Sequence, residues 1–148
     1  MSKKLKNTLL GLAAVFVIMQ LFQIDKTNPP VLKDQDFIVL AQPPEHLQQV
    51  LRDACYDCHS NETAYPWYTS VAPISWWIRR HINEGRKHLN FSVWAEYDAE
   101  KQDHKLEECE EEVEEGEMPL SSYTIVHGEA KLSEADRREL AEWFASLR

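Results

Sequence analysis

Glycine is scarce in this sequence, with four residues among 148, and cysteine is limited to three. Few glycines leave few positions for tight turns, so the composition favours helices over a strand-and-turn fold. Three cysteines exclude a disulfide-stapled scaffold. Basic residues are also outnumbered, and the formal net charge of −9 argues against nucleic acid as a partner. The length leaves room for one compact domain with appendages.

The longest apolar run extends from Thr8 to Ile24 and is preceded by Lys3, Lys4 and Lys6. Positive residues before an apolar segment are typical of an export signal. The run is at the short end of the roughly 17–25 residues that cross a bilayer, and no small-residue cleavage site or lipid-attachment cysteine comes after it. We therefore expect an uncleaved membrane anchor, with a cleaved signal peptide as the alternative.

The segment Cys55-Tyr56-Asp57-Cys58-His59 has the C-x-x-C-H spacing at which a c-type haem is attached. Two thiols on one helical turn can form thioethers with the two vinyl groups of the porphyrin, and the adjacent imidazole can ligate the iron. The abundant tryptophan and tyrosine, five of each, suit a core that includes a large flat group. A redox dithiol, half of a zinc site and a local disulfide are the competing interpretations. No βαβ pattern surrounds the motif and only one other cysteine exists, so the spacing favours haem.

Two proline pairs, Pro29-Pro30 and Pro43-Pro44, block a continuous helix after the apolar run. Residues 26–43 are therefore expected to form a linker with one short apolar segment. Further on, residues 60–73 combine polar residues, two prolines and three aromatics, which predicts an irregular loop that can wrap a haem edge.

Helical periodicity predicts four helices in the remaining chain. The first begins after Pro44 and carries the C-x-x-C-H motif at its end. The second covers residues 75–89, and the third covers 99–115 and ends at Gly116. The last begins after Ser133, which is expected to cap its N-terminus.

Met118 is the favoured second axial ligand of the haem iron. It comes after Gly116, where the backbone is free, and precedes Pro119, which stiffens the loop. An imidazole ligand would give a site of lower potential, because Met/His ligation raises the potential. A vacant sixth position is the third option. The remaining candidates are four histidines, of which the last two are more simply surface or loop residues: His81, His88, His104 and His127.

Other side chains have candidate roles near the haem. Arg79, Arg80 and Arg86 on the second helix are candidates for pairing with the haem propionates. Cys109 falls on the inward face of the third helix and is expected to be a buried, unpaired thiol.

Acidic residues are concentrated between Glu96 and Glu117, where twelve acids accompany two lysines. A solvated helix face is the simpler interpretation. The alternative is a docking surface for a basic redox partner, which long-range electrostatics would steer.

With these motifs in order, the chain resembles the bacterial haem-binding domain family, whose members are small, exported, single-haem domains related in outline to class I cytochromes c. The resemblance implies an all-helical haem c fold with attachment through Cys55 and Cys58, His59 as proximal ligand and Met118 as distal ligand. It does not supply an activity. It covers residues 43–148 and is carried by these segments: Cys55–Thr63, Tyr65–Tyr68, Pro73, Glu84–Arg86, Leu89–Ser92, Trp94, Gly116–Pro119, Tyr123 and His127.

The sequence thus predicts an all-α, cytochrome c-like domain at 44–148, wrapped round one covalently bound haem c. A linker at 26–43 and a membrane-anchor helix within 1–25 would tether it to the bacterial inner membrane by a single pass, with the haem domain in the periplasm. The predicted function is electron transfer with a redox partner, basic if the acidic helix docks it, rather than catalysis. The alternatives are a haem-based sensor or peroxidase-like protein with an open or displaceable sixth ligand, and a small zinc or dithiol protein.

Overall fold

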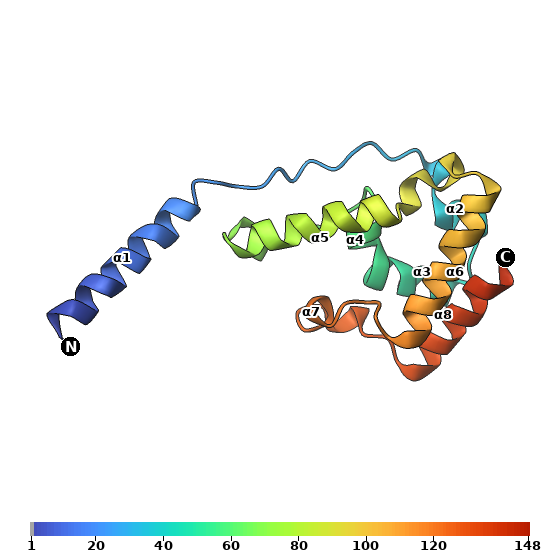
Figure 1. The fold of residues 1–148 in the computed structure, drawn as a ribbon. Coiled ribbons are helices and arrows are strands. Elements are labelled where there is room, and N and C mark those ends of the chain that lie inside the picture. The colour runs from blue at the N-terminus through green and yellow to red at the C-terminus, as the bar shows by residue number, and fades with distance from the viewer. Residues whose placement is uncertain (1) are drawn as a thin grey trace.

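The structure, a computed structural model, describes residues 2–148 and contains helices but no strand over that range (Figure 1). The all-α prediction is therefore confirmed. The elements in chain order are α1 (Lys3–Met19), η1 (Lys33–Gln35), α2 (Phe37–Ala41), α3 (Glu45–Leu51), η2 (Arg52–Tyr56), α4 (Asp57–His59), η3 (Trp67–Ser70), α5 (Ile74–His88), η4 (Phe91–Glu96), α6 (Ala99–Glu115), α7 (Ser121–Thr124), η5 (Gly128–Ala130) and α8 (Glu134–Ser146).

The elements α3, η2 and α4 form one continuous helix, the motif helix, which carries the C-x-x-C-H motif at its end, as predicted. The middle segment η2 is a π-helical turn. Such a turn holds one residue more than an α-helical turn, so it shifts the register of the later part of the helix. Leu47 and Leu51 before it and Tyr56 within it are buried in the protein core, whereas Cys55 and Cys58 line a cavity that borders this core.

The other three predicted helices are confirmed to within a residue at their starts. α6 ends where expected, since Gly116 adopts the left-handed conformation (φ 81°) that terminates helices. α8 begins with a capping box, in which Ser133 Oγ accepts from the Asp136 N–H and the Asp136 carboxylate accepts from the Ser133 N–H.

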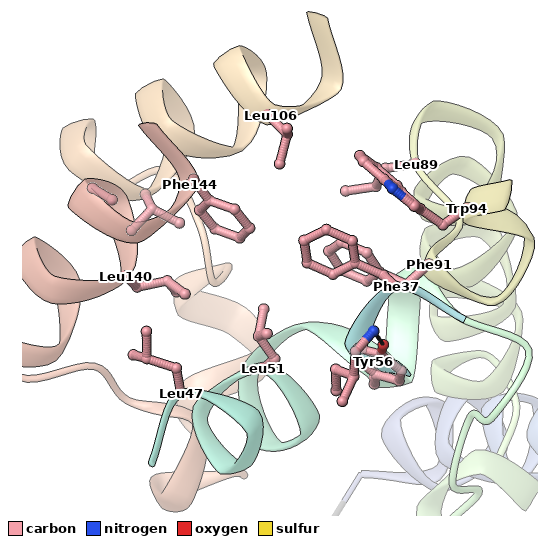
Figure 2. Close-up of a cluster of buried hydrophobic side chains, with 13 residues drawn as sticks. Phe37, Leu47, Leu51, Tyr56, Leu89, Phe91, Trp94, Leu106, Leu140 and Phe144 are labelled. Carbon is pink, nitrogen blue, oxygen red and sulfur yellow. Dashed lines mark hydrogen bonds between the residues drawn. The ribbon is translucent and has the colours of Figure 1, made fainter. Parts of the chain in front are cut away.

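The hydrophobic core lies among the motif helix, α2, η4, α6 and α8 (Figure 2). Phe37 is at its centre, with its ring centroid 4.9 Å from that of Phe91 and 4.6 Å from that of Trp94. The short apolar segment within residues 26–43 therefore adds side chains to the core. The division of the chain at residues 25 and 43 stays a prediction.

The membrane anchor expected near the N-terminus is wrong. α1 has 17 residues, includes three lysines in its first four positions and ends at Met19, before the apolar run does. The Gln20 side-chain amide bonds both backbone groups of Ala72, at 3.0 Å each, and the chain continues without a helix. Among residues 2–148 there is no helix with both the length and the apolar character needed to cross a bilayer. The predicted localisation, a single-pass protein of the inner membrane with its haem domain in the periplasm, is therefore wrong.

Candidate functional site

A cavity of about 630 Å³ lies between the motif helix, α5, α6 and the loop after α6. Its volume is within the roughly 300–1,000 Å³ of small-molecule and cofactor sites. The four side chains predicted to hold the haem all line this cavity: Cys55, Cys58, His59 and Met118. The fold thus brings a thioether to two thiols and an imidazole that precede it by about sixty residues.

His59 is oriented by two backbone carbonyls. Its Nδ1 lies 3.1 Å from the Gly85 oxygen and 3.2 Å from the Leu89 oxygen. A carbonyl can only accept, so Nδ1 carries the proton and Nε2 keeps its lone pair. Burial lowers the pKa of His59, which keeps the imidazole neutral. A neutral ring with one nitrogen anchored and the other free is the form that ligates a metal.

The two motif cysteines are not joined in a disulfide. Burial raises the pKa of Cys55 to about 12, and burial together with the charge of Asp57 raises the pKa of Cys58 to about 11. A redox dithiol needs the opposite shift, because the thiolate is its nucleophile. Within residues 2–148 no group of three or more His, Cys, Asp or Glu is arranged to hold a metal ion, so the zinc interpretation lacks the further ligands that it needs.

Cys109 lines the same cavity from α6. The sequence predicts Cys109 on the inward face of the helix, and the structure agrees. The side chain packs against the core and also lines the cavity. Burial raises the pKa of this thiol as well, with a smaller contribution from nearby Cys55. Three thiols therefore face one space.

Gly85 allows α5 to touch the motif helix at backbone distance. A Cβ built on Gly85 would be 2.7 Å from the Cys58 carbonyl oxygen, closer than real Cβ contacts. Any larger residue would separate the two helices and move the carbonyl that His59 bonds. The requirement for glycine here is steric and not conformational.

The three candidate arginines have different surroundings. Arg86 donates to the Ser60 carbonyl at 2.7 Å and to the Asn28 and Thr63 side chains, so it fastens the loop after the motif. Arg79 donates to the Tyr65 hydroxyl at 3.3 Å. Arg80 alone of the three lines the cavity.

Asp57, between the two cysteines, is bonded on both carboxylate oxygens. It accepts from the Ala64 N–H at 2.8 Å and from the Tyr123 hydroxyl at 2.8 Å. The Tyr123 ring also lines the cavity. The segment 120–127, which contains α7, is thereby tied to the motif itself.

The four histidines considered as alternative axial ligands divide into two pairs. His81 and His88 line the cavity from α5. His104 is exposed on α6 beside Glu107 and Glu108, and His127 Nε2 bonds the Tyr68 hydroxyl at 2.5 Å. Only the first pair is placed to compete with Met118.

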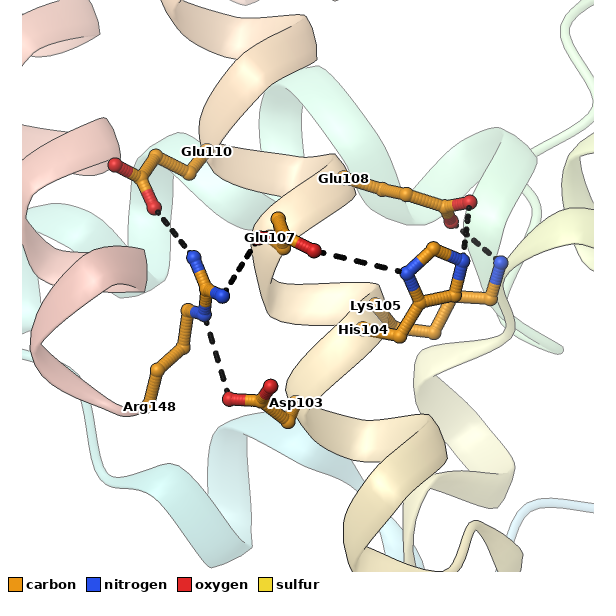
Figure 3. Close-up of polar contacts among 7 residues, drawn as sticks. All are labelled: Asp103, His104, Lys105, Glu107, Glu108, Glu110 and Arg148. Carbon is orange, nitrogen blue, oxygen red and sulfur yellow. Dashed lines mark hydrogen bonds and ion pairs between the residues drawn. The ribbon is translucent and has the colours of Figure 1, made fainter.

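Part of the acidic segment is neutralised within the molecule (Figure 3). Arg148, after the end of α8, reaches three carboxylates of α6 at 3.3, 2.7 and 3.4 Å: Asp103, Glu107 and Glu110. Lys105 pairs with Glu108 on the cavity side. The remaining acids of α6 are exposed, and Glu112 among them also lines the cavity.

The donor set of the cavity fits a haem. It combines a free imidazole nitrogen, a thioether and two thiols one helical turn apart, within walls that are largely apolar. The sequence profile described as a haem-binding domain matches residues 14–146, nearly the whole chain. The chain belongs to the haem-binding domain family. It is therefore a haem-binding protein, as the resemblance implied. No curated protein and no solved structure matches it.

Several residues in or beside this candidate site were not assigned a role from the sequence. Gly85 and Tyr123 occur in the resembling segments, but their contacts with the motif depend on how distant segments fold together. Arg137 on α8 bonds the loop that carries Met118. No periodicity distinguishes it from the exposed arginine beside it.

Proposed function

We propose that this haem-binding protein is an electron carrier with a single haem c, attached covalently through Cys55 and Cys58. His59 and Met118 are the axial ligands. The proposal is supported above all by one cavity that gathers these four side chains from the motif helix and a distant loop. When bound, the haem supplies one-electron redox chemistry at its iron.

The residues of the chain have separate roles in this proposal. His59 is held with Nε2 free by the Gly85 and Leu89 carbonyls, so the imidazole needs no reorganisation to bind iron. Met118 supplies a neutral sulfur, which favours the reduced state. Arg80 supplies a guanidinium for a propionate, since Arg79 and Arg86 bond groups of the protein.

Covalent attachment is tested by replacing each cysteine of the cavity in turn. The parent, expressed with a c-type maturation pathway, should keep its haem after denaturation and solvent extraction. Cys55→Ser and Cys58→Ser should each leave one thioether or none, as peptide mass spectrometry would report. Cys109→Ser, a matched control in the same cavity, should keep both. Extraction of intact haem from the parent would contradict covalent attachment.

The axial ligand is tested with carbon monoxide on the reduced protein. The parent should bind it slowly or not at all, and Met118→Ala should create rapid binding. His81→Ala and His88→Ala are the controls, because both side chains line the cavity. Tight, rapid binding by the parent would instead favour the haem-based sensor or peroxidase-like alternative.

We further propose that the redox partner is a protein with a basic surface that meets the solvent-facing acids of α6. Glu108 and Glu112 line the haem cavity, so this helix lies beside the site. The rate of reduction by a basic carrier should fall steeply with ionic strength, and that of a neutral small-molecule reductant should not. Equal salt dependence for both would contradict the docking role.

A further inference from the structure

Both backbone polar groups of Met118 are fixed, and by different helices. Its N–H donates to the Glu112 carbonyl of α6 at 3.0 Å. Its carbonyl oxygen accepts from Arg137 Nη1 of α8 at 3.1 Å. A residue whose N–H and C=O are both bonded has a restrained backbone, so the Cα–Cβ bond from which the thioether extends keeps one direction.

The same Arg137 nitrogen also donates to the Val113 carbonyl near the end of α6. Nη1 carries two hydrogens, so each carbonyl can receive one. A cation at this position also meets the negative end of the α6 dipole. The guanidinium packs over Gly116, where a Cβ would lie 3.6 Å from Nη1.

Arg137 differs from the arginine beside it. Arg138 is exposed and faces Glu142 at 4.0 Å. Arg137 is half-buried and, among the described residues, forms no ion pair with a carboxylate, although the chain holds 25 acids. Its donors are directed instead at the Val113 and Met118 carbonyls, before and within the methionine loop (residues 116–120).

We infer that Arg137 is the positioning residue of Met118: by joining α8 to the end of α6 and to the Met118 carbonyl, it holds the thioether toward the haem. The inference rests on the proposed role of Met118 as axial ligand. Without the guanidinium, the Met118 carbonyl loses this partner and Met118 is held by its N–H bond to α6, so the sulfur spends less time at the iron.

The test compares four variants of the full-length, haem-loaded protein, with Met118→Ala as the reference for loss of the ligand. Arg137→Leu removes the charge and both hydrogen bonds to the carbonyls. Arg137→Lys keeps the charge but lacks the planar guanidinium that makes those bonds. Ser133→Ala removes the N-cap of the same helix without touching the loop. Arg138→Leu removes an equal charge one residue away. The readouts are carbon monoxide affinity of the reduced form, the absorption signature of thioether ligation and the midpoint potential.

Arg137→Leu should raise the affinity for carbon monoxide at least tenfold, weaken the thioether signature and lower the potential. Arg137→Lys should fall between it and the parent, and the two controls should match the parent. If the Leu variant yields no holoprotein, the Lys variant decides, and parent-like values there overturn the inference.

Two further results would also overturn it. Parent-like values for Arg137→Leu, with altered values for Met118→Ala, would show that Met118 is the ligand and that Arg137 does not position it. Values for Ser133→Ala equal to those for Arg137→Leu would assign the effect to general loosening of α8. If Met118→Ala has parent-like values, Met118 is not the axial ligand. That result contradicts the proposed function and differs from both results above.

Discussion

At the scale of single residues, the contact between Gly85 and Cys58 sets how closely α5 approaches the motif. The structure leaves no room for a Cβ there, since the nearest atom is a backbone oxygen that cannot turn aside. The same glycine supplies a carbonyl to His59 Nδ1. One missing methyl group therefore controls both packing and the orientation of the proposed proximal ligand.

We predict that Gly85→Ala destabilises the protein by about 1–3 kcal/mol, because overpacking outweighs the better helix propensity of alanine. Thermal unfolding of the haem-loaded protein measures this. Gly11→Ala is the matched control, since Gly11 is also helical and a Cβ there meets nothing within 4 Å. Equal stability changes in the two variants would count against the close approach of α5.

A second residue-scale prediction concerns the charge of Arg80 at the cavity. Arg80→Gln should lower the midpoint potential, because removing a positive charge near the haem favours the oxidised state. We expect a change equivalent to roughly 0.5–1 kcal/mol, the size of an exposed ion pair. Lys87→Gln, an exposed residue of the same helix that does not line the cavity, should change the potential less. Potentiometric titration would distinguish the two.

At the scale of elements, α8 connects the core to the methionine loop, and its N-terminus carries a pH-dependent contact. Hydrogen bonds from the Ser133 hydroxyl, then from its N–H, and a further bond from His46 at 2.9 Å lower the pKa of Asp136 below 3.8. A lowered pKa in the folded state means that the carboxylate stabilises the fold above pH 3.8. That contribution disappears as the pH falls through the lowered value.

We predict that Asp136→Asn lowers the free energy of unfolding by a few tenths to about 1 kcal/mol near neutral pH. The gap from the parent should close as the pH falls from about 6 to about 2, because protonation then removes the same charge from the parent. Denaturant unfolding at both pH values measures the gap. Glu134→Gln, in the same turn, should show a smaller gap, and a gap that widens in acid would contradict the assignment.

At the scale of the whole molecule, the charge is uneven, and Arg148 compensates part of it. This arginine joins the end of the chain to three carboxylates of α6 (Figure 3). Because α6 and α8 pack against each other, these ion pairs add an electrostatic contact between two helices that border the core.

We predict that Arg148→Ala lowers the thermal unfolding midpoint by roughly one to three degrees at low salt, and by less at high salt, where repulsion among the freed carboxylates is screened. Arg138→Ala, whose ion pair is long and exposed, is the control and should change little. Calorimetry at two ionic strengths measures both. A loss that grows with salt would contradict an electrostatic role.

The sequence by itself determined the main helices and indicated that the protein binds haem. Periodicity located α5, α6 and α8 because each buries one apolar stripe, and Gly116 and Ser133 act on their own local backbone. The C-x-x-C-H spacing predicted haem because two thiols and an imidazole on one turn are a local arrangement. The family confirms haem binding, and attachment at this motif stays a proposal. The N-terminal apolar run led to the wrong prediction of a membrane anchor, because apolar composition alone does not show where a helix ends.

Only the tertiary structure decided which distant groups surround the cavity. Arg80, Arg86 and Arg137 look alike in the sequence, yet one lines the cavity, one fastens a loop and one bonds the methionine carbonyl. Gly85 matters because another helix passes at backbone distance. These roles depend on contacts between segments far apart in the chain, and such contacts are set by how helices pack rather than by any local pattern of residues.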